Sequence, residues 1–184
     1  MKKIIVFFVF LLINITCVLA QSVKWYSFED ALQLNAERAA SGLATKKIFV
    51  DVYTDWCGWC KRMDAATFAH PVIAEKLNTD WIAVKINAER KDTVTINGQI
   101  FVNENKGTRS SHQLAQVLLN GQMSYPSYAL IDETGKSIQV IKGYIEVQQF
   151  EMYLGFFSSD AYKRMSFEDF QETFKSLIQK EKDE

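Results

Sequence analysis

Apolar residues run in short blocks along this chain, and their spacing predicts strands that alternate with helices. Residues 48–53 and 81–86 are rich in β-branched and aromatic side chains, which is typical of buried strands. Residues 27–42 instead carry apolar positions that suit a helix. Residues 57–77 are also expected to be helical, with Pro71 marking a kink or a break. With a short strand expected at 23–26, the order is strand, helix, strand, helix, strand. This order predicts a right-handed βαβ arrangement around a central parallel sheet.

The second half of the chain predicts a hairpin, a further pair of strands and three helices. Asn97-Gly98 lies between β-forming residues, and this dipeptide is the strongest short signal for a β-hairpin. Residues 128–131 and 137–141 predict an antiparallel pair of strands. Helices are expected at 111–119, at 147–157 and after Ser166.

In two of these helices, the spacing of the apolar side chains predicts one apolar face. The first helix places Leu114, Val117 and Leu118 on one face, which is expected to pack in the core. The last helix carries a stripe of Phe167, Phe170, Phe174 and Leu177, for which core packing is favoured and a partner surface is the alternative.

The first twenty residues have the pattern of a secretory signal peptide. Lys2 and Lys3 precede an apolar run of ten residues, and the segment ends in small residues up to Ala20. The run is shorter than the roughly 20 apolar residues that a membrane-spanning helix needs. We therefore expect a leader at 1–20 and, after its cleavage, one domain at 21–184 that is periplasmic or secreted, with no stable membrane association. The alternatives are a membrane anchor and a lipoprotein that carries its lipid on Cys17.

Charge and cysteine content narrow the classes of function. The chain has 21 basic and 22 acidic side chains, a net charge of −1, which becomes −3 once the two lysines of the leader are removed. So small an imbalance argues against a nucleic-acid partner. Of the three cysteines, Cys17 leaves with the leader, and Cys57 and Cys60 remain. A secreted chain that used disulfides for stability would carry several scattered pairs rather than one pair in a single turn.

Two thiols at this spacing can hold a metal, form a static crosslink, or cycle between dithiol and disulfide. A structural zinc needs four ligands, and the histidines that could complete the set, His70 and His112, are far apart in the sequence. Covalent haem needs a histidine directly after Cys60, where Lys61 stands. A static disulfide that closes so short a loop gains little entropy. Redox cycling is therefore favoured, without a metal or a bound cofactor.

The expected secondary structure assigns different tasks to the two thiols. A strand that ends near residue 53, followed by a helix that begins at the motif, would place Cys57 at the helix N-terminus. The free N–H groups and the positive end of the helix dipole stabilise a thiolate there, and the thiolate is the reactive form. Cys57 is thus predicted to be the exposed nucleophile and Cys60 the shielded thiol that resolves the mixed disulfide.

Two stretches of the sequence resemble the thioredoxin superfamily. IFVDVYTDWCGWCK, residues 48–61, is similar to the active-site strand and helix, and MSYPSYALID, residues 123–132, is similar to the cis-proline loop. Residues 51–68 resemble the exported thioredoxin-like proteins and the periplasmic C-terminal domain of DsbD-type thiol:disulfide interchange proteins. One departure from the family pattern is Trp59, which stands where a proline is usual.

The resemblance covers a core at about 47–157 and implies an α/β thioredoxin fold. In such a fold a central mixed β-sheet is flanked by helices. This chain would add an inserted β-hairpin at about 91–107 and a C-terminal helical extension at 158–184.

The resemblance also explains two charged residues in apolar strands. Asp51 interrupts a buried strand, where a carboxylate is costly and has a raised pKa. The family pattern implies that Asp51 takes the proton of Cys60 and that Lys85 lies near this acid and tunes it. The alternatives are a strand-end carboxylate bonded to backbone and a solvated lysine at a strand edge.

Four further residues are expected to bind the substrate. Trp56 and Trp59 flank the thiols, so we expect them to shield the sulfur atoms and to shape the rim of a groove, although ordinary packing is an alternative. Pro126 is expected to follow a cis peptide bond and to shape the loop that faces Cys57. The backbone around Tyr125 would then pair with an extended segment of the substrate.

Together these residues predict an exported thiol–disulfide oxidoreductase that reduces protein disulfides. Its partners would be disulfide-containing client proteins and a protein that donates electrons. The alternatives are a disulfide oxidase or isomerase with the same residues, and a binding or chaperone module that keeps the fold without turnover. The presence of both thiols argues against the last of these.

Overall fold

The computed structural model describes residues 22–178 of the chain. The signal peptide expected at 1–20 therefore lies outside the described residues. Among the helices that are described, none is long and apolar enough to cross a membrane.

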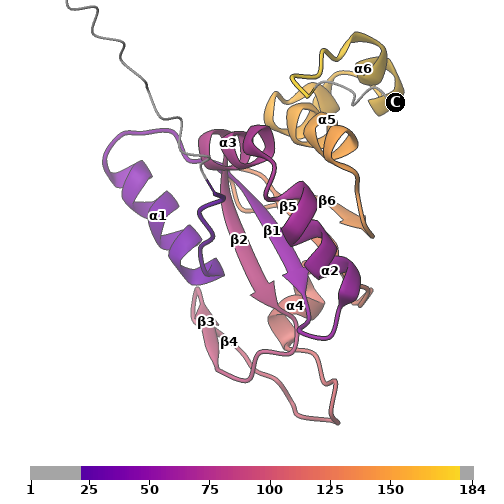
Figure 1. Cartoon of the computed structure of the whole chain (residues 1–184). Coiled ribbons are helices and arrows are strands. Elements are labelled where there is room, and N and C mark those ends of the chain that lie inside the picture. The colour runs from indigo at the N-terminus through magenta and orange to yellow at the C-terminus, as the bar shows by residue number, and fades with distance from the viewer. Residues whose placement is uncertain (1–21, 179–184) are drawn as a thin grey trace, which may run out of the picture.

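Four strands form the central sheet, in the order β2-β1-β5-β6 (Figure 1). They are β1 (Lys47–Tyr53), β2 (Trp81–Asn87), β5 (Ser127–Ile131) and β6 (Ser137–Lys142). β1 and β2 are parallel, whereas β5 is antiparallel to β1 and β6 is antiparallel to β5. The predicted strands agree with the observed ones to within a residue at each end. The sheet is mixed and flanked by helices, which confirms the thioredoxin fold.

The strand expected at 23–26 is reduced to a single bridge between Tyr26 and Val84. The backbone of Tyr26 exchanges hydrogen bonds with Ala83 and Lys85 on the outer edge of β2. Pairing ends there because the next residue, Ser27, already caps a helix. The expectation of a full strand was wrong, since the local sequence allows only one residue of contact before the chain turns away.

Side chains alternate along β1 between two apolar layers. Phe49 faces the layer that is covered by α2 (Gly58–Arg62), α3 (Pro71–Asp80) and α5 (Val147–Ser158). Val50 faces the layer that is covered by α1 (Phe28–Ala40), α4 (Gln113–Leu118) and the hairpin. Because side chains two apart along a strand share a face, Asp51 lies on the same side as Phe49.

The break expected at Pro71 is confirmed, and the segment expected to be helical at 57–77 is divided into three parts. After α2, residues Met63–Thr67 form a π-helical turn, and α3 begins only at Pro71. Proline fits the first position of a helix because it has no N–H to donate. The imidazole of His70 caps this second start, with Nδ1 accepting the N–H of Val72 at 3.3 Å.

The inserted hairpin is confirmed, with β3 (Val94–Ile96) paired to β4 (Gln99–Phe101). Asn97 and Gly98 form its turn, both with positive φ, of 50° and 79°, which is what the tightest hairpin turn requires. Figure 1 shows the hairpin at the end of the sheet toward which β1 and β2 run, and α2 also begins there.

Two side chains expected in the core are exposed instead. Val117 is 60% exposed, because α4 is short and its narrow inner face is taken by Leu114, Ala115 and Leu118. Leu177 is 68% exposed, because α6 (Phe167–Thr173) ends before it and the helical stripe does not continue.

The C-terminal extension is attached to the domain through a buried carboxylate. Glu151 of α5 is fully buried, and its oxygens accept hydrogen bonds from the hydroxyl of Ser176 at 2.5 Å and from the N–H of Leu177 at 3.0 Å. Lys76 of α3 lies 3.8 Å from the same carboxylate. A residue type that is rarely buried is therefore satisfied by the last described residues of the chain.

Candidate functional site

Cys57 and Cys60 form a disulfide at the start of α2. Cys57 occupies the N-cap position, and its sulfur accepts the N–H of Cys60 at 3.1 Å. A short connection after β1 sets this position, with the N–H of Cys57 donating to the carbonyl of Thr54 at 3.1 Å. The strand-to-helix arrangement therefore matches the prediction.

The two sulfurs do not differ in exposure as the sequence suggested. Cys57 and Cys60 are each 4% exposed in the disulfide form, so the expectation of one exposed and one shielded cysteine was wrong for this state. The side chains that face solvent are the neighbouring indoles, with Trp56 at 48% and Trp59 at 57% exposure. The position at the helix start, rather than exposure, distinguishes the two cysteines.

Trp56 is contacted on three sides. Its Nε1 donates a hydrogen bond to Oε1 of Glu89 at 2.9 Å. The guanidinium of Arg109 lies over its ring at 4.4 Å from the centroid, and the ring of Tyr125 meets it edge-on at 5.8 Å. The structure thus brings together two of the predicted groove residues, Trp56 and Tyr125.

Trp59 belongs to a separate aromatic group on the other side of the motif. Its ring centroid lies 5.4 Å from that of Tyr144, in a tilted arrangement. The guanidinium of Arg62 lies over both rings, at 5.8 Å from Trp59 and 5.4 Å from Tyr144.

The loop before β5 contains the Tyr125–Pro126 bond, which is cis. Pro126 is buried, and its carbonyl accepts the N–H of Gly143 at 2.8 Å. Tyr125 is half-buried, and within residues 22–178 its backbone N–H and C=O make no hydrogen bond.

Asp51 is 2% exposed and points into the layer beneath α2 and α3. One carboxylate oxygen lies 3.1 Å from Nζ of Lys85, its register partner on β2, and the other has no hydrogen-bond partner within the described chain. Burial raises the pKa of Asp51 to about 6, against the opposing effect of Lys85. Neither carboxylate oxygen is hydrogen-bonded to a sulfur.

Lys85 connects the buried acid to the helix that follows the cysteines. Its ammonium group contacts both Asp51 and Asp64, and Asp64 lies one helical turn after Cys60. Burial lowers the pKa of Lys85, but the two carboxylates raise it by more, so the net change is upward. Lys85 is therefore a charged and partly shielded partner of Asp51, not a solvated lysine at a strand edge.

Two hydroxyl groups are also buried without a hydrogen-bond partner within the described chain, and one of them lies close to Asp51. They belong to Thr54, which follows β1, and to Tyr128, the register partner of Asp51 on β5. Burial raises the pKa of Tyr128, and the charge of Asp51 adds to the effect. Tyr128 is therefore disfavoured from ionising beside Asp51.

The histidines considered as metal ligands are both used as helix caps. His112 is fully buried, and its Nδ1 accepts the N–H of Leu114 at 3.1 Å, as His70 does for α3. Over the described part of the chain, no three side chains of His, Cys, Asp or Glu gather in a way that could hold a metal ion.

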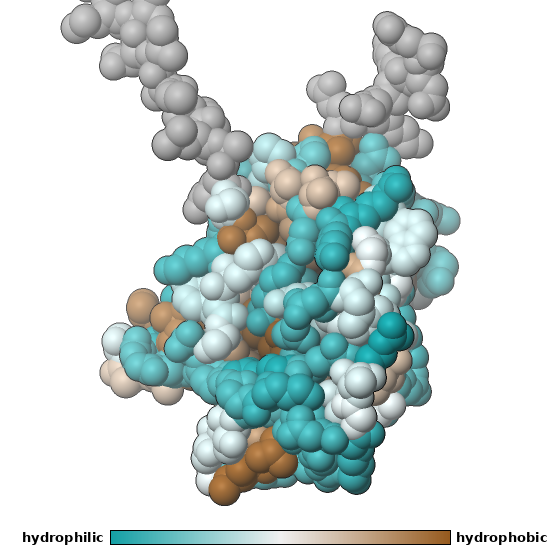
Figure 2. Space-filling model, turned by 60° about the horizontal axis from the view of Figure 1, so that its bottom comes forward, coloured by the Kyte–Doolittle hydropathy of each residue, from teal (hydrophilic) through white to brown (hydrophobic). Residues whose placement is uncertain are grey.

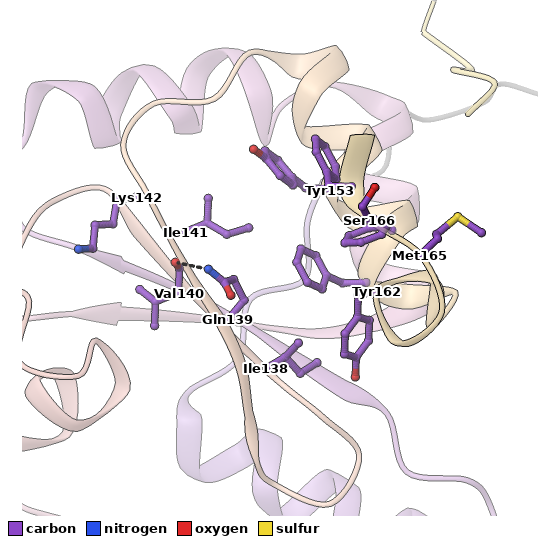
Figure 3. A pocket seen from close by; sticks show the side chains of 12 residues that line it. Ile138, Gln139, Val140, Ile141, Lys142, Tyr153, Tyr162, Met165 and Ser166 are labelled. Atoms are coloured by element: carbon purple, nitrogen blue, oxygen red, sulfur yellow. Dashed lines mark hydrogen bonds between the residues drawn. The ribbon is translucent and has the colours of Figure 1, made fainter. Parts of the chain in front are cut away.

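A cavity of about 690 Å³ lies away from the cysteines, between β6, α5 and the turn that leads to α6 (Figure 3). Its walls are largely apolar and aromatic, and neither cysteine nor Asp51 lines it. The side-chain amide of Gln139 donates to the carbonyl of Val140 at 3.3 Å. No chemistry at the disulfide depends on this cavity.

Several residues at the site were not predicted from the sequence. Asp64 gave a signal, since an acid four residues after Cys60 lies one turn further along the same helix. Glu89 and Arg109 gave none, because they reach Trp56 from loops that are distant in the sequence.

Comparison with known proteins agrees with this geometry. A family model described as a thioredoxin-like domain matches residues 34–158. Among solved structures, a DsbH oxidoreductase has a TM-score of 0.51 at 17% identity, covering 78% of this chain and 87% of that chain. A thioredoxin-fold protein from Helicobacter pylori has a TM-score of 0.51 at 19% identity, covering 70% and 80%.

The C-terminal domain of DsbD from Neisseria meningitidis, in its oxidised form, has a TM-score of 0.44 at 18% identity and covers 71% of this chain and 96% of that chain. Among curated proteins, no match was found.

Proposed function

Since the chain belongs to the thioredoxin-like domain family, we propose that it is an exported thiol–disulfide oxidoreductase that reduces disulfides in client proteins. The observation that carries the proposal is the disulfide between Cys57 and Cys60, with Cys57 at the N-cap of α2. An N–H that points at a sulfur stabilises it as a thiolate, which is the form that attacks a disulfide.

The reaction begins from the dithiol form of the protein. The Cys57 thiolate attacks one sulfur of the client disulfide, forming a mixed disulfide and releasing the first client thiolate. Cys60 then loses its proton and attacks the Cys57 sulfur, which releases the second client thiolate. The client gains two electrons, and the protein is left with the disulfide seen in the structure. A protein electron donor restores the dithiol by the reverse exchange, and no cofactor is required.

Asp51 is the proposed acceptor of the Cys60 proton. A group with a pKa of about 6 is mainly ionised at pH 7, yet it is close enough to neutrality to take up a proton. Nζ of Lys85 lies 3.1 Å from the carboxylate, and its positive charge partly offsets the rise in the pKa of Asp51.

The negative charge of Asp51 also bears on the direction of the reaction. A dedicated oxidant stabilises its dithiol form by strongly lowering the pKa of its nucleophile. A buried carboxylate in the layer beneath α2 works against that, because a nearby negative charge disfavours the thiolate. Asp51 therefore supports a reductant over the oxidase and isomerase alternatives.

The open backbone of Tyr125 is the proposed pairing site for an extended client segment. Such pairing adds main-chain hydrogen bonds without regard to sequence. The indoles of Trp56 and Trp59, both about half exposed, are the proposed walls on either side. Export is proposed from the leader pattern at 1–20, and residues 21–184 are proposed to be one domain.

Substitution of each cysteine by serine tests the mechanism. Cys57→Ser should abolish disulfide reduction, because no nucleophile remains at the helix start. Cys60→Ser should attack but fail to release, so clients should accumulate as mixed disulfides on Cys57, detectable by non-reducing electrophoresis and mass spectrometry.

The wild-type protein and the double variant are the controls. A Cys60→Ser protein that captures no client through Cys57 would contradict the mechanism. Clients that bind equally well to the double variant would favour the binding or chaperone module instead.

A further inference from the structure

Each tryptophan beside the disulfide has an arginine stacked on it. Arg109 lies over Trp56 at 4.4 Å, and Arg62 lies over Trp59 at 5.8 Å. Arg62 lies two residues after Cys60 at the end of α2, whereas Arg109 comes from the loop after the inserted hairpin. The loop that follows the insertion thus adds a cation to one side of the site.

The loop that carries Arg109 is fixed by a buried asparagine. Asn103 is 5% exposed, and its side-chain amide donates to the carbonyls of Ser110 at 2.6 Å and Arg90 at 3.1 Å. Arg90 follows Glu89 directly, and Glu89 accepts the hydrogen bond of the Trp56 indole at 2.9 Å. The two segments that contact Trp56 are therefore joined to each other through one side chain.

The two stacked arginines differ from the others in the use of their N–H groups. Arg38, Arg90 and Arg164 donate hydrogen bonds to carbonyls or carboxylates. The guanidinium groups of Arg62 and Arg109 form no hydrogen bond and no ion pair with any of residues 22–178, and both residues are exposed. A guanidinium that lies over an aromatic ring and makes no hydrogen bond keeps its N–H groups available, and these can match a carboxylate in a bidentate geometry.

The acids around the site are mostly engaged already. Glu89 accepts from Trp56, Asp64 contacts Lys85, and Glu146 accepts from the hydroxyl of Tyr144 at 3.2 Å. Asp55 is the exception, an exposed carboxylate without an ion pair in the described chain. Figure 2 shows the face with the hairpin and the start of α2 as mainly hydrophilic, with its most hydrophobic residues in small separate patches. A polar client segment fits such a face.

We propose that Arg109 is a specificity-determining residue, which favours client disulfides that have a glutamate or aspartate next to one cysteine. The client carboxylate would bind the free edge of the guanidinium, while the stack on Trp56 holds that edge beside the disulfide. This inference rests on the proposed reductase function.

The test uses two synthetic disulfide peptides that are identical except for Glu or Gln beside one cysteine. The pre-reduced mature protein is mixed with each peptide at pH 7 and low salt, and the second-order rate constant of peptide reduction is measured by mass spectrometry. The wild type should reduce the Glu peptide about two- to five-fold faster, the range that an exposed ion pair supplies. The ratio should fall toward one at high salt.

Three variants separate the role of Arg109 from a general loss of charge. Arg109→Gln should bring the ratio to about one. Arg109→Lys should keep part of the preference, since the charge stays but the planar stack is weaker. Lys91→Gln makes the same change of charge elsewhere on the insert and should keep the wild-type ratio.

The outcomes distinguish a failure of the proposed Arg109 specificity from a failure of the proposed reductase function. Equal rates for both peptides with the wild type, or an unchanged ratio in Arg109→Gln, would overturn the specificity of Arg109 while leaving the reductase in place. If the wild type reduces neither peptide, the proposed function itself fails.

Discussion

The buried carboxylate of Asp51 makes a measurable prediction about stability and pH. Its pKa rises from an ordinary 3.8 to about 6 in the folded protein, mainly because the group is removed from water. Each pH unit between two pKa values is worth about 1.4 kcal/mol. Ionising Asp51 in the folded chain therefore lowers the free energy of unfolding by about 3 kcal/mol.

The sign follows from proton binding. Between pH 4 and pH 6 the folded state holds a proton on Asp51 that the unfolded state has already lost. The stabilising contribution of this proton is fully present below pH 3.8 and is lost as the pH rises through about 6. In Asp51→Asn the amide resembles the neutral acid at every pH, and Lys85 keeps its contact with Asp64.

Urea unfolding of the oxidised protein between pH 4 and pH 8 measures this difference. Relative to the wild type, Asp51→Asn should become more stable by about 2.5 kcal/mol between pH 4 and pH 8, with most of the change between pH 4 and pH 7. Asp55→Asn, an exposed acid in the same region, is the matched control and should stay within about 0.5 kcal/mol of the wild type. A difference between Asp51→Asn and the wild type that does not depend on pH would refute the reasoning.

Two further predictions concern direction and export. The equilibrium redox potential against glutathione should be clearly more reducing than about −120 mV, the value of a dedicated oxidant. A potential near that value would mean that the protein works in the oxidising direction. The mature protein recovered from cells should begin at or near Gln21 by intact mass, and retention of residues 1–20 or a lipid on Cys17 would contradict the proposed export.

The fold could be predicted largely because its signals are local. Asn97 and Gly98 specify the hairpin turn by themselves, and Ser27 caps α1 by accepting the N–H of Asp30 at 3.0 Å, three residues away. The strand expected at 23–26 failed for the opposite reason. Whether a short β-like segment pairs depends on where the neighbouring helix begins, which its own residues do not specify.

In the candidate site, too, features with a local sequence signal could be predicted, and features that depend on distant segments could not. Asp51 was noticeable because it interrupts an apolar strand, and the parallel register of β1 and β2 places it opposite Lys85. Burial of the Cys57 sulfur could not be predicted, since it depends on how large neighbours such as Trp56 pack. The contacts of Trp56 with Glu89 and Arg109 join segments 33 and 53 residues away in sequence, and no local pattern encodes them.

Glu151 bears on how this domain can be transplanted. The family match ends at residue 158, whereas the groups that satisfy the buried carboxylate come from Ser176 and Leu177. A chain cut at the family boundary would keep the redox motif and the sheet, but it would leave a charge in the interior with only Lys76 nearby. Losing the partners of a buried charged group costs more than about 1–3 kcal/mol, a large share of a small domain's stability. The natural unit for grafting, fusion or recombination therefore extends about twenty residues beyond the homologous core.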